Sequence, residues 1–170
     1  QHLEGFQYIA EYKDYIKTNL KTTKESNAET QKEIDIISKA IDNATFEGIT
    51  QSEYDEFATY MKSTYESVAS QYGVDLETYL YFFFGGMSLD DFNTELQSAA
   101  EFNVRQRYLL QQIIKEENMT LSEEEYEEKL AEYMEEYGYT DKDQFVTDMG
   151  GKEVIEESAL FDKAMELVLS

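Results

Sequence analysis

The chain has 170 residues, enough for one domain with a buried core, and a net charge of −23 that would repel nucleic-acid phosphates and anionic membranes. It has no cysteine, which excludes disulfides and thiolate chemistry, and no proline, where ordinary usage of about 5 % would give roughly eight. Because proline breaks helix interiors, its absence suits a mostly helical chain.

The first predicted element is a long helix within residues 1–48. No glycine or proline interrupts the stretch from Phe6 to Asn43, so we favour one helix over two helices with a loose joint. It should stop near Asp42–Asn43, before a turn at Gly48. The chain begins at Gln1 without an initiator methionine, so we expect a longer native protein. The apolar positions of this helix are Phe6, Ile9, Ile16, Leu20, Ile34, Ile37 and Ile41.

From residue 50 onward one pattern occurs twice. The first copy has Thr-Gln-Ser-Glu at 50–53, Tyr-Gly at 72–73 and Gly-Gly at 85–86. The second has Thr-Leu-Ser-Glu at 120–123, Tyr-Gly at 137–138 and Gly-Gly at 150–151, so the last two motifs keep an offset of 65 residues. Thr50 with Glu53, and Thr120 with Glu123, have the spacing of a capping box, which starts a helix. We therefore predict two helical hairpins, at 49–118 and 119–170.

The two hairpins carry matching apolar positions. In each, a helix face with spacing 4, 3, 4 leads to a glycine, Gly73 or Gly138, where a helix end favours a left-handed residue. A short helix, a glycine pair and a longer helix follow; we expect the longer helices at about Ser88–Glu117 and Gly151–Leu169. No strand alternation occurs, so the predicted fold class is all-α. The two faces are Met61, Tyr65, Val68, Tyr72 and Tyr126, Leu130, Tyr133, Tyr137.

Residues suited to a reaction centre are scarce. His2 is the only histidine, which rules out a Ser-His-Asp or Cys-His arrangement and His/Cys zinc ligation in this chain. Asp141-Lys142-Asp143 does not continue into a calcium-loop pattern, and the glycine pairs lack a phosphate-loop context. The longest apolar run, Tyr79–Phe84, is far shorter than the ~20 residues that span a bilayer. We expect no enzyme activity, cofactor, metal or membrane span.

Aromatic side chains are abundant, with 14 Tyr and 10 Phe in a chain of mean hydropathy −0.62. We expect Leu80, Phe84, Phe145 and Met149 to pack between helices. Six consecutive large side chains at Tyr79–Phe84 point in every direction around a helix, so some must face outward. Exposed aromatics and methionines suit adaptable apolar contacts. The residues that we predict to form a binding surface are Phe57, Tyr60, Tyr79, Phe82, Phe83, Met87 and Met134.

Several stretches make the chain resemble the C-terminal domain of bacterial trigger factor. The most specific is Ala99–Glu125, preceded by Ala40–Asn43 and Phe46–Thr50, and the likeness covers nearly the whole chain. Two features depart from the family. Thr50 stands where the family usually has proline, and acids and tyrosines are unusually frequent.

The resemblance implies a long helix and two arms that form a cradle, and an ATP-independent chaperone that binds nascent or unfolded polypeptides. In the family, a ribosome-docking domain and a peptidyl-prolyl isomerase domain lie outside this region, so neither activity is expected of these residues. The implied location is the bacterial cytoplasm, and a homodimer is one expected assembly.

Two other functions remain open from the sequence. The first is an exported or lipid-anchored foldase chaperone of the SurA or PrsA kind, because Gly73–Tyr79 fits a short-helix pattern of those proteins. The second is an acidic helical domain whose stretch around Glu125 meets one basic partner. Salt distinguishes this second alternative from a chaperone that binds apolar clients, because exposed charge pairs are screened within ~10 Å at 0.1 M whereas apolar contacts persist. The native sequence upstream of Gln1 would decide the first alternative.

Overall fold

The structure is a computed structural model that describes residue 24, residues 27–28 and residues 30–170. The chain divides into two compact units, residues 1–40 and Ile41–Ser170. In the first unit the described residues are helical, and this helix continues to Asn43, the predicted end. The predicted apolar positions Phe6, Ile9, Ile16 and Leu20 lie outside the described residues.

Six helices follow in the second unit, and the described residues contain no strand, which confirms the all-α class. Both long helices end within a residue of their predicted limits, with Ser88 and Gly151 as N-caps. The helices are α2 (Gln51–Gln71), α3 (Leu76–Phe83), α4 (Leu89–Glu116), α5 (Glu123–Tyr137), α6 (Lys142–Asp148) and α7 (Lys152–Leu169).

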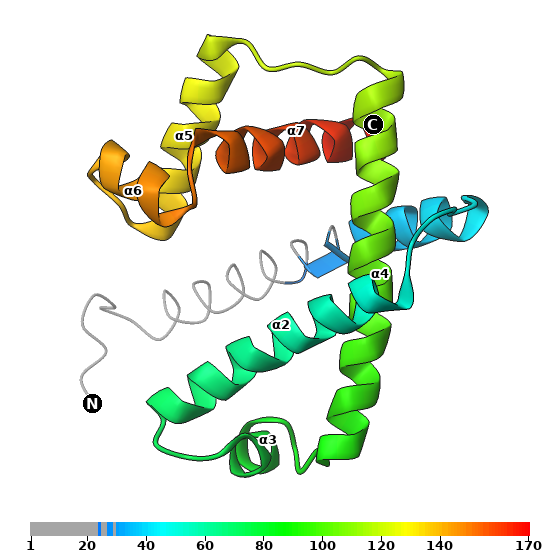
Figure 1. The fold of residues 1–170 in the computed structure, drawn as a ribbon, viewed down its shortest axis with the longest axis vertical. Coiled ribbons are helices and arrows are strands. Elements are labelled where there is room, and N and C mark those ends of the chain that lie inside the picture. Colours follow the sequence, from blue (N-terminus) through cyan, green and yellow to red (C-terminus); the bar gives the residue numbers. More distant parts are fainter. Residues whose placement is uncertain (1–23, 25–26, 29) are drawn as a thin grey trace, which may run out of the picture. The chain divides into compact units, whose positions relative to one another are not determined.

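The long helix α4 organises this unit. Helices α2 and α7 both contact α4, at different heights, and both project to the same side of it (Figure 1). Small buried side chains allow helices to approach closely. They lie on all three crossing helices, as Ala58 and Ala69 in α2, Ala100 in α4, and Ala159 and Ala164 in α7.

The first arm consists of α2, α3 and the start of α4, and it has a core of its own. Asp75 caps α3 by accepting the N–H of Thr78 at 2.8 Å. Leu76 and Leu80 then lie one helical turn apart and are buried. They pack with Phe92 and Leu96 of α4, and the half-buried Met61, Tyr65, Met87 and Leu89 complete the cluster.

The second arm consists of α5, α6 and α7, and it repeats this plan. Asp141 caps α6 by accepting the N–H of Gln144 at 3.0 Å. Phe145, which occupies the position 65 residues after Leu80, is likewise fully buried. The core is Tyr126, Leu130, Phe145 and Ile155, surrounded by Tyr133, Met134, Tyr139, Val146 and Met149.

Three details differ from the sequence-based expectations. The cap of α5 is Ser122 with Glu125, not Thr120 with Glu123, because Ser122 has the same three-residue spacing to a glutamate. Phe84 packs on Tyr65 but remains 38 % exposed, so it is not a core residue. The last tyrosine of each predicted face is also exposed, although its ring lies against the short helix of its arm. Tyr72 is 62 % and Tyr137 59 % exposed.

Candidate functional site

The end of the first arm carries an exposed cluster of rings, which we name the aromatic tip. Its members are Tyr72, Tyr79, Tyr81, Phe82, Phe83 and Phe84. Phe82 is 71 % exposed and Phe83 57 %. Because α3 buries Leu76 and Leu80 on one side, its remaining large side chains face away from the core. An exposed apolar cluster of this kind typically marks an interaction surface.

The rings of the aromatic tip are held in contact with one another. Tyr79 stacks on Phe83 with centroids 4.8 Å apart, and Tyr72 lies 5.2 Å from Phe83. Phe84 lies 5.9 Å from Tyr65, whose ring meets the buried Phe92 edge-on at 5.1 Å. Because Phe84 also lies 5.8 Å from Tyr79, a continuous series of ring contacts connects Tyr72, Tyr79, Phe83 and Phe84 to the core of the arm. Tyr81 and Phe82 contact each other at 5.4 Å. The series supports one arrangement of the four connected rings before anything binds.

A second apolar surface lies where α2, α4 and α7 meet, and we name it the cradle pocket. Its volume is about 590 Å³. Phe57 and Tyr60 contribute from α2, one turn apart, and their ring centroids are 6.3 Å from each other. Phe161 and Met165 contribute from α7 with a spacing that places both on one helix face. Val104 and Leu110 of α4 form its floor.

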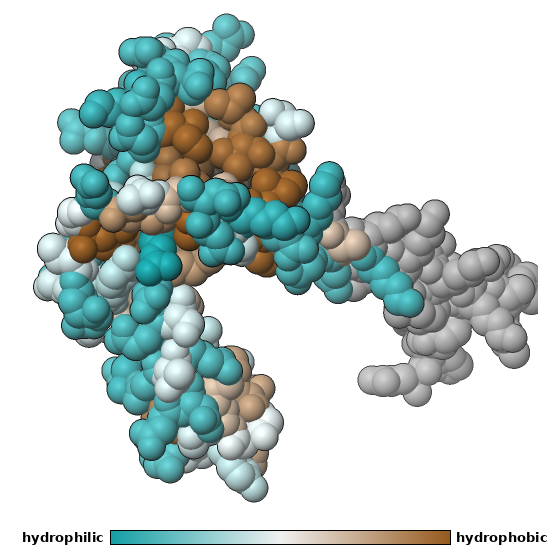
Figure 2. Space-filling view, turned by 90° about the vertical axis from the view of Figure 1, so that its right-hand side faces the viewer, coloured by the Kyte–Doolittle hydropathy of each residue, from teal (hydrophilic) through white to brown (hydrophobic). Residues whose placement is uncertain are grey.

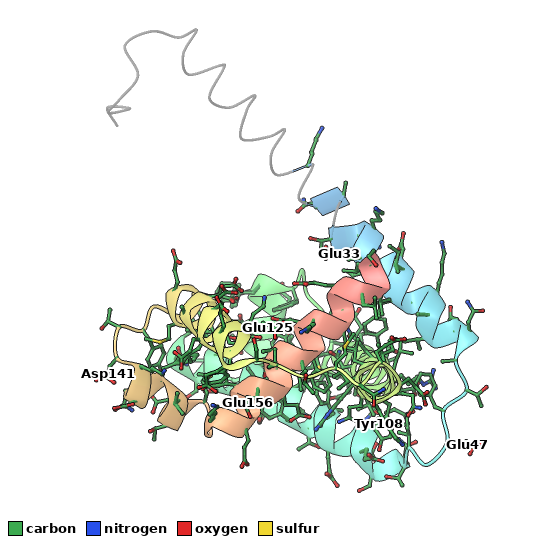
Figure 3. The ribbon with its side chains drawn as sticks, turned by 90° about the horizontal axis from the view of Figure 1, so that it is seen from above. Glu33, Glu47, Tyr108, Glu125, Asp141 and Glu156 are labelled. Carbon is green, nitrogen blue, oxygen red and sulfur yellow. The ribbon has the colours of Figure 1, made fainter. Side chains whose placement is uncertain are left out.

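Acidic groups surround this pocket. Glu53, Glu56 and Asp162 line it, against the single cation Arg107, which pairs with Glu157 at 3.4 Å. The Tyr108 phenol donates a hydrogen bond to Glu53, which holds the pKa of that carboxyl below its usual value and raises the pKa of the phenol. Figure 3 shows Tyr108 within the side chains of α4 beside α2.

The second arm presents a smaller apolar surface. A hollow of about 330 Å³ contains Tyr137 and Val154, both exposed, beside Tyr133 and Met149. The Tyr133 phenol donates to Asp162 at 2.7 Å; burial and this hydrogen bond raise the pKa of the phenol. Of the rings of this arm only Tyr137 is exposed, whereas the aromatic tip exposes five.

The predicted surface residues fall into four separate places. Tyr79, Phe82 and Phe83 meet in the aromatic tip, whereas Phe57 and Tyr60 line the cradle pocket. Met87 packs against the core of the first arm and borders a hollow at the glycine pair. Met134 packs against the core of the second arm. The sequence pattern therefore identified ring-rich segments but not which of them lie together.

Sequence reasoning missed residues of both surfaces. Tyr72, Tyr81 and Phe84 belong to the tip, and Phe161 and Met165 line the cradle pocket. Tyr72 carries a local signal, since it is the last tyrosine before Gly73 and has no further helical turn to cover it. Phe161 and Met165 of α7 carry no such signal, because they line the pocket only as a result of the way α7 crosses α4.

Two further features are absent from the described part of the chain. Its Asp and Glu side chains form no group of three or more that could hold a metal ion. None of its helices combines the length and the apolarity needed to cross a bilayer. In the space-filling view the hydrophobic residues gather in patches bordered by hydrophilic ones (Figure 2).

The fold and these two surfaces define a class: an all-α binding domain that presents apolar patches on helical arms. The particular family follows from comparison with known proteins, where a model of the C-terminus of bacterial trigger factor protein matches residues 8–170. The chain belongs to this family, as its sequence predicted. No solved structure is a significant match.

Curated relatives agree with this assignment. A trigger factor of Agathobacter rectalis is 28 % identical over 99 % of this chain and 38 % of its own length. One of Lachnoclostridium phytofermentans is 31 % identical over 89 % of this chain and 37 % of its own length. Trigger factor 1 of Desulfitobacterium hafniense is 32 % identical over 79 % and 31 %, respectively. The chain thus spans less than two fifths of the length of these relatives.

Proposed function

We propose that this chain is a chaperone domain that binds unfolded or nascent polypeptides without ATP, with the aromatic tip as its principal contact surface. The observation that carries the proposal is the exposure of adjacent rings at the end of one arm, led by Phe82 and Phe83. Membership of the trigger factor C-terminus family supports it.

The chemistry of the aromatic tip suits transient and unspecific binding. Rings gain free energy from any apolar side chain that they cover, about 25 cal/mol for each Å² removed from water. They impose little directional demand compared with hydrogen bonds. The contacts to Tyr65 and Phe92 keep the tip ordered, so little conformational entropy is lost on binding. The net charge of −23 would keep a loaded complex soluble.

The cradle pocket offers a second contact for the same polypeptide. It is lined by residues of α2, α4 and α7, whereas the tip belongs to α3 and the residues that flank it. Figure 1 shows α3 away from the place where α2 crosses α4. A client that touches both would be held at two places, which raises the effective concentration at each. We therefore include Phe57, Tyr60, Phe161 and Met165 in the proposed client surface.

The test is suppression of aggregation of a chemically denatured client by the chain at stoichiometric amounts, measured by light scattering. Phe82→Ser should weaken protection at least severalfold while helicity and the unfolding midpoint remain those of the parent, because Phe82 lies outside the buried cluster. Tyr137→Ser is the matched control, an exposed ring of the second arm that should matter less. Equal loss in both variants, or no protection by the parent, would contradict the proposal.

Salt distinguishes this function from a charge-driven partner domain. Apolar binding at the aromatic tip should persist at about 0.5 M salt, where exposed ion pairs are strongly screened. The short-helix pattern Gly73–Tyr79 does not favour an extracytoplasmic foldase, because its residues are explained by the positive φ of Gly73 and the Asp75 cap. We therefore keep the bacterial cytoplasm as the proposed location; a signal peptide in the full-length gene would overturn that. Homodimer formation stays a prediction for light scattering of the purified chain.

A further inference from the structure

The second arm joins α4 through a short irregular segment, residues 118–121, which we name the linker. Asn118 follows the end of α4 with a φ of +50°, and Ser122 then caps α5. The Ser122 N–H donates to the Glu125 carboxylate at 2.8 Å, and the Glu125 N–H donates back to the Ser122 hydroxyl. The linker and the first turn of α5 together form the root of the arm.

One side chain of α7 contacts both parts of this root. The Lys163 ammonium donates to the carbonyl oxygen of Thr120, in the linker, at 3.1 Å. It also donates to the carboxylate of Glu125, the residue that closes the cap of α5. Lys163 follows Phe161 and Asp162, which line the cradle pocket beside α4. The lysine therefore connects the root of the arm to the part of α7 that lies against α4. Figure 3 shows Glu125 between α5 and α7.

Lys163 lies in an acidic environment, in which its positive charge offsets repulsion between carboxylates. Residues 119–170 contain 16 acids and only four basic residues, all lysines. A crevice of about 140 Å³ between α5 and α7 holds Lys163 and Lys129 among acids. Without Lys163, the carboxylates of two acidic helices would face each other across this crevice with less compensation. Its acids are Glu125, Glu128, Glu132 and Glu166.

A second lysine of α7 provides an internal comparison. Lys152 also pairs with a glutamate in the first turn of α5, Glu123, at 3.2 Å, and its ammonium lies 4.4 Å from the centroid of the Tyr126 ring. Its contacts are all to side chains of α5 and α7, and none is to the linker. The two lysines therefore differ in one respect that matters here, the bond from Lys163 to the linker carbonyl.

We propose that Lys163 is a positioning residue. It holds the linker and the first turn of α5 against α7, and it thereby fixes the position of the start of the second arm relative to α7. The start of the first arm is held by a neutral hydrogen-bond donor and not by an ion pair, since its capping glutamate Glu53 accepts from the phenol of Tyr108. The proposal goes beyond the proposed function, because it rests on these contacts whether or not the arms hold a client.

Hydrogen exchange measured by mass spectrometry tests this proposal. In Lys163→Met the amides of residues 118–125 should exchange about fivefold faster, since a half-exposed ion pair and a hydrogen bond are lost. Lys163→Arg should restore most of the protection, because it keeps the charge and the donors. Lys152→Met should leave the exchange rates of the linker amides close to those of the parent. Exchange around Ile155 and Ala159 should not change, since both remain buried in the packed part of α7.

Three results would overturn the assignment: unchanged exchange of residues 118–125 in Lys163→Met, the same acceleration in Lys152→Met, or no rescue by Lys163→Arg. Should Lys163→Met fail to fold, Lys163→Gln replaces it, because an amide can still donate to the Thr120 carbonyl without carrying charge. Its linker should then exchange at an intermediate rate, and a rate equal to the parent would also overturn the proposal. No client is needed, so this failure is distinguishable from failure of the proposed function.

Discussion

The Tyr108 phenol of α4 donates its hydrogen bond to the Glu53 carboxylate, which also accepts the backbone N–H of Thr50 at 2.7 Å. One carboxylate thus closes the start of α2 and connects it to the central helix. Glu125 likewise closes the start of α5, but it accepts from Lys163 and so connects α5 to α7 and not to the central helix. In both arms the glutamate of a capping box is also a tertiary contact.

Replacement of Tyr108 by Phe should loosen the start of α2. The variant keeps the ring and loses only the hydroxyl, so Glu53 loses the largest cause of its lowered pKa. We expect a lower urea midpoint at pH 7 and a smaller effect than that of truncating a core residue. A carboxyl whose pKa is lowered by folding adds stability above its unfolded value of 4.5, and this is lost as the pH falls. The difference between variant and parent should therefore shrink below pH 4.5; identical midpoints at pH 7 would contradict the prediction.

The carboxyl of Glu125 should titrate far below its ordinary range. The hydrogen bond from Lys163, followed by the bonds at Ser122, lowers the pKa of Glu125 from 4.5 to about 2. Because the folded-state pKa is the lower one, its contribution to stability is complete above pH 4.5 and disappears as the pH falls towards about 2. Carbon-detected NMR of the side chain would give this pKa directly. Lys163→Met should raise it, and a parent value near 4.5 would exclude the ion pair.

A core substitution in one arm should destabilise that arm and leave the core of the other arm unaffected. Leu80→Ala removes a fully buried side chain from the first arm, and Phe145→Ala removes the corresponding one from the second. Each should lower the free energy of unfolding by about 3–5 kcal/mol, because a cavity remains. Hydrogen exchange should accelerate mainly in the arm that carries the change. Tyr81→Ala, an exposed neighbour of Leu80, should stay within about 0.5 kcal/mol. Equal acceleration in both arms would indicate one shared core.

The glycine at the end of α5 should resist substitution for conformational reasons alone. Gly138 has a φ of +73°, and a Cβ added there would meet no atom within 4 Å. Gly138→Ala should therefore cost about 1–2 kcal/mol from the left-handed backbone and nothing from crowding. Gly138→Asn should cost less, because asparagine tolerates this conformation better. Equal thermal midpoints for Gly138→Ala and the parent would show that the helix end can rearrange.

Local chemistry explains why much of the fold could be predicted. The start of α4 at Ser88, the left-handed Gly138 and the end of the first helix at Asn43 depend on neighbours within a few residues. Where two local solutions compete, the sequence is ambiguous. Thr120 and Ser122 each precede a glutamate by three residues, and in the structure only Ser122 forms the cap of α5.

The amino-acid sequence by itself determined the helical class, the repeated pattern and the need for some rings of Tyr79–Phe84 to face outward, because these depend on composition, spacing and local hydrogen bonding. The family followed from the resemblance of segments such as Ala99–Glu125. Only the tertiary structure decided that Phe83 packs on Tyr72, that Phe57 of α2 and Phe161 of α7 line one pocket, and that Lys163 reaches Thr120. These arrangements depend on how separate helices pack against one another, which no local sequence pattern records.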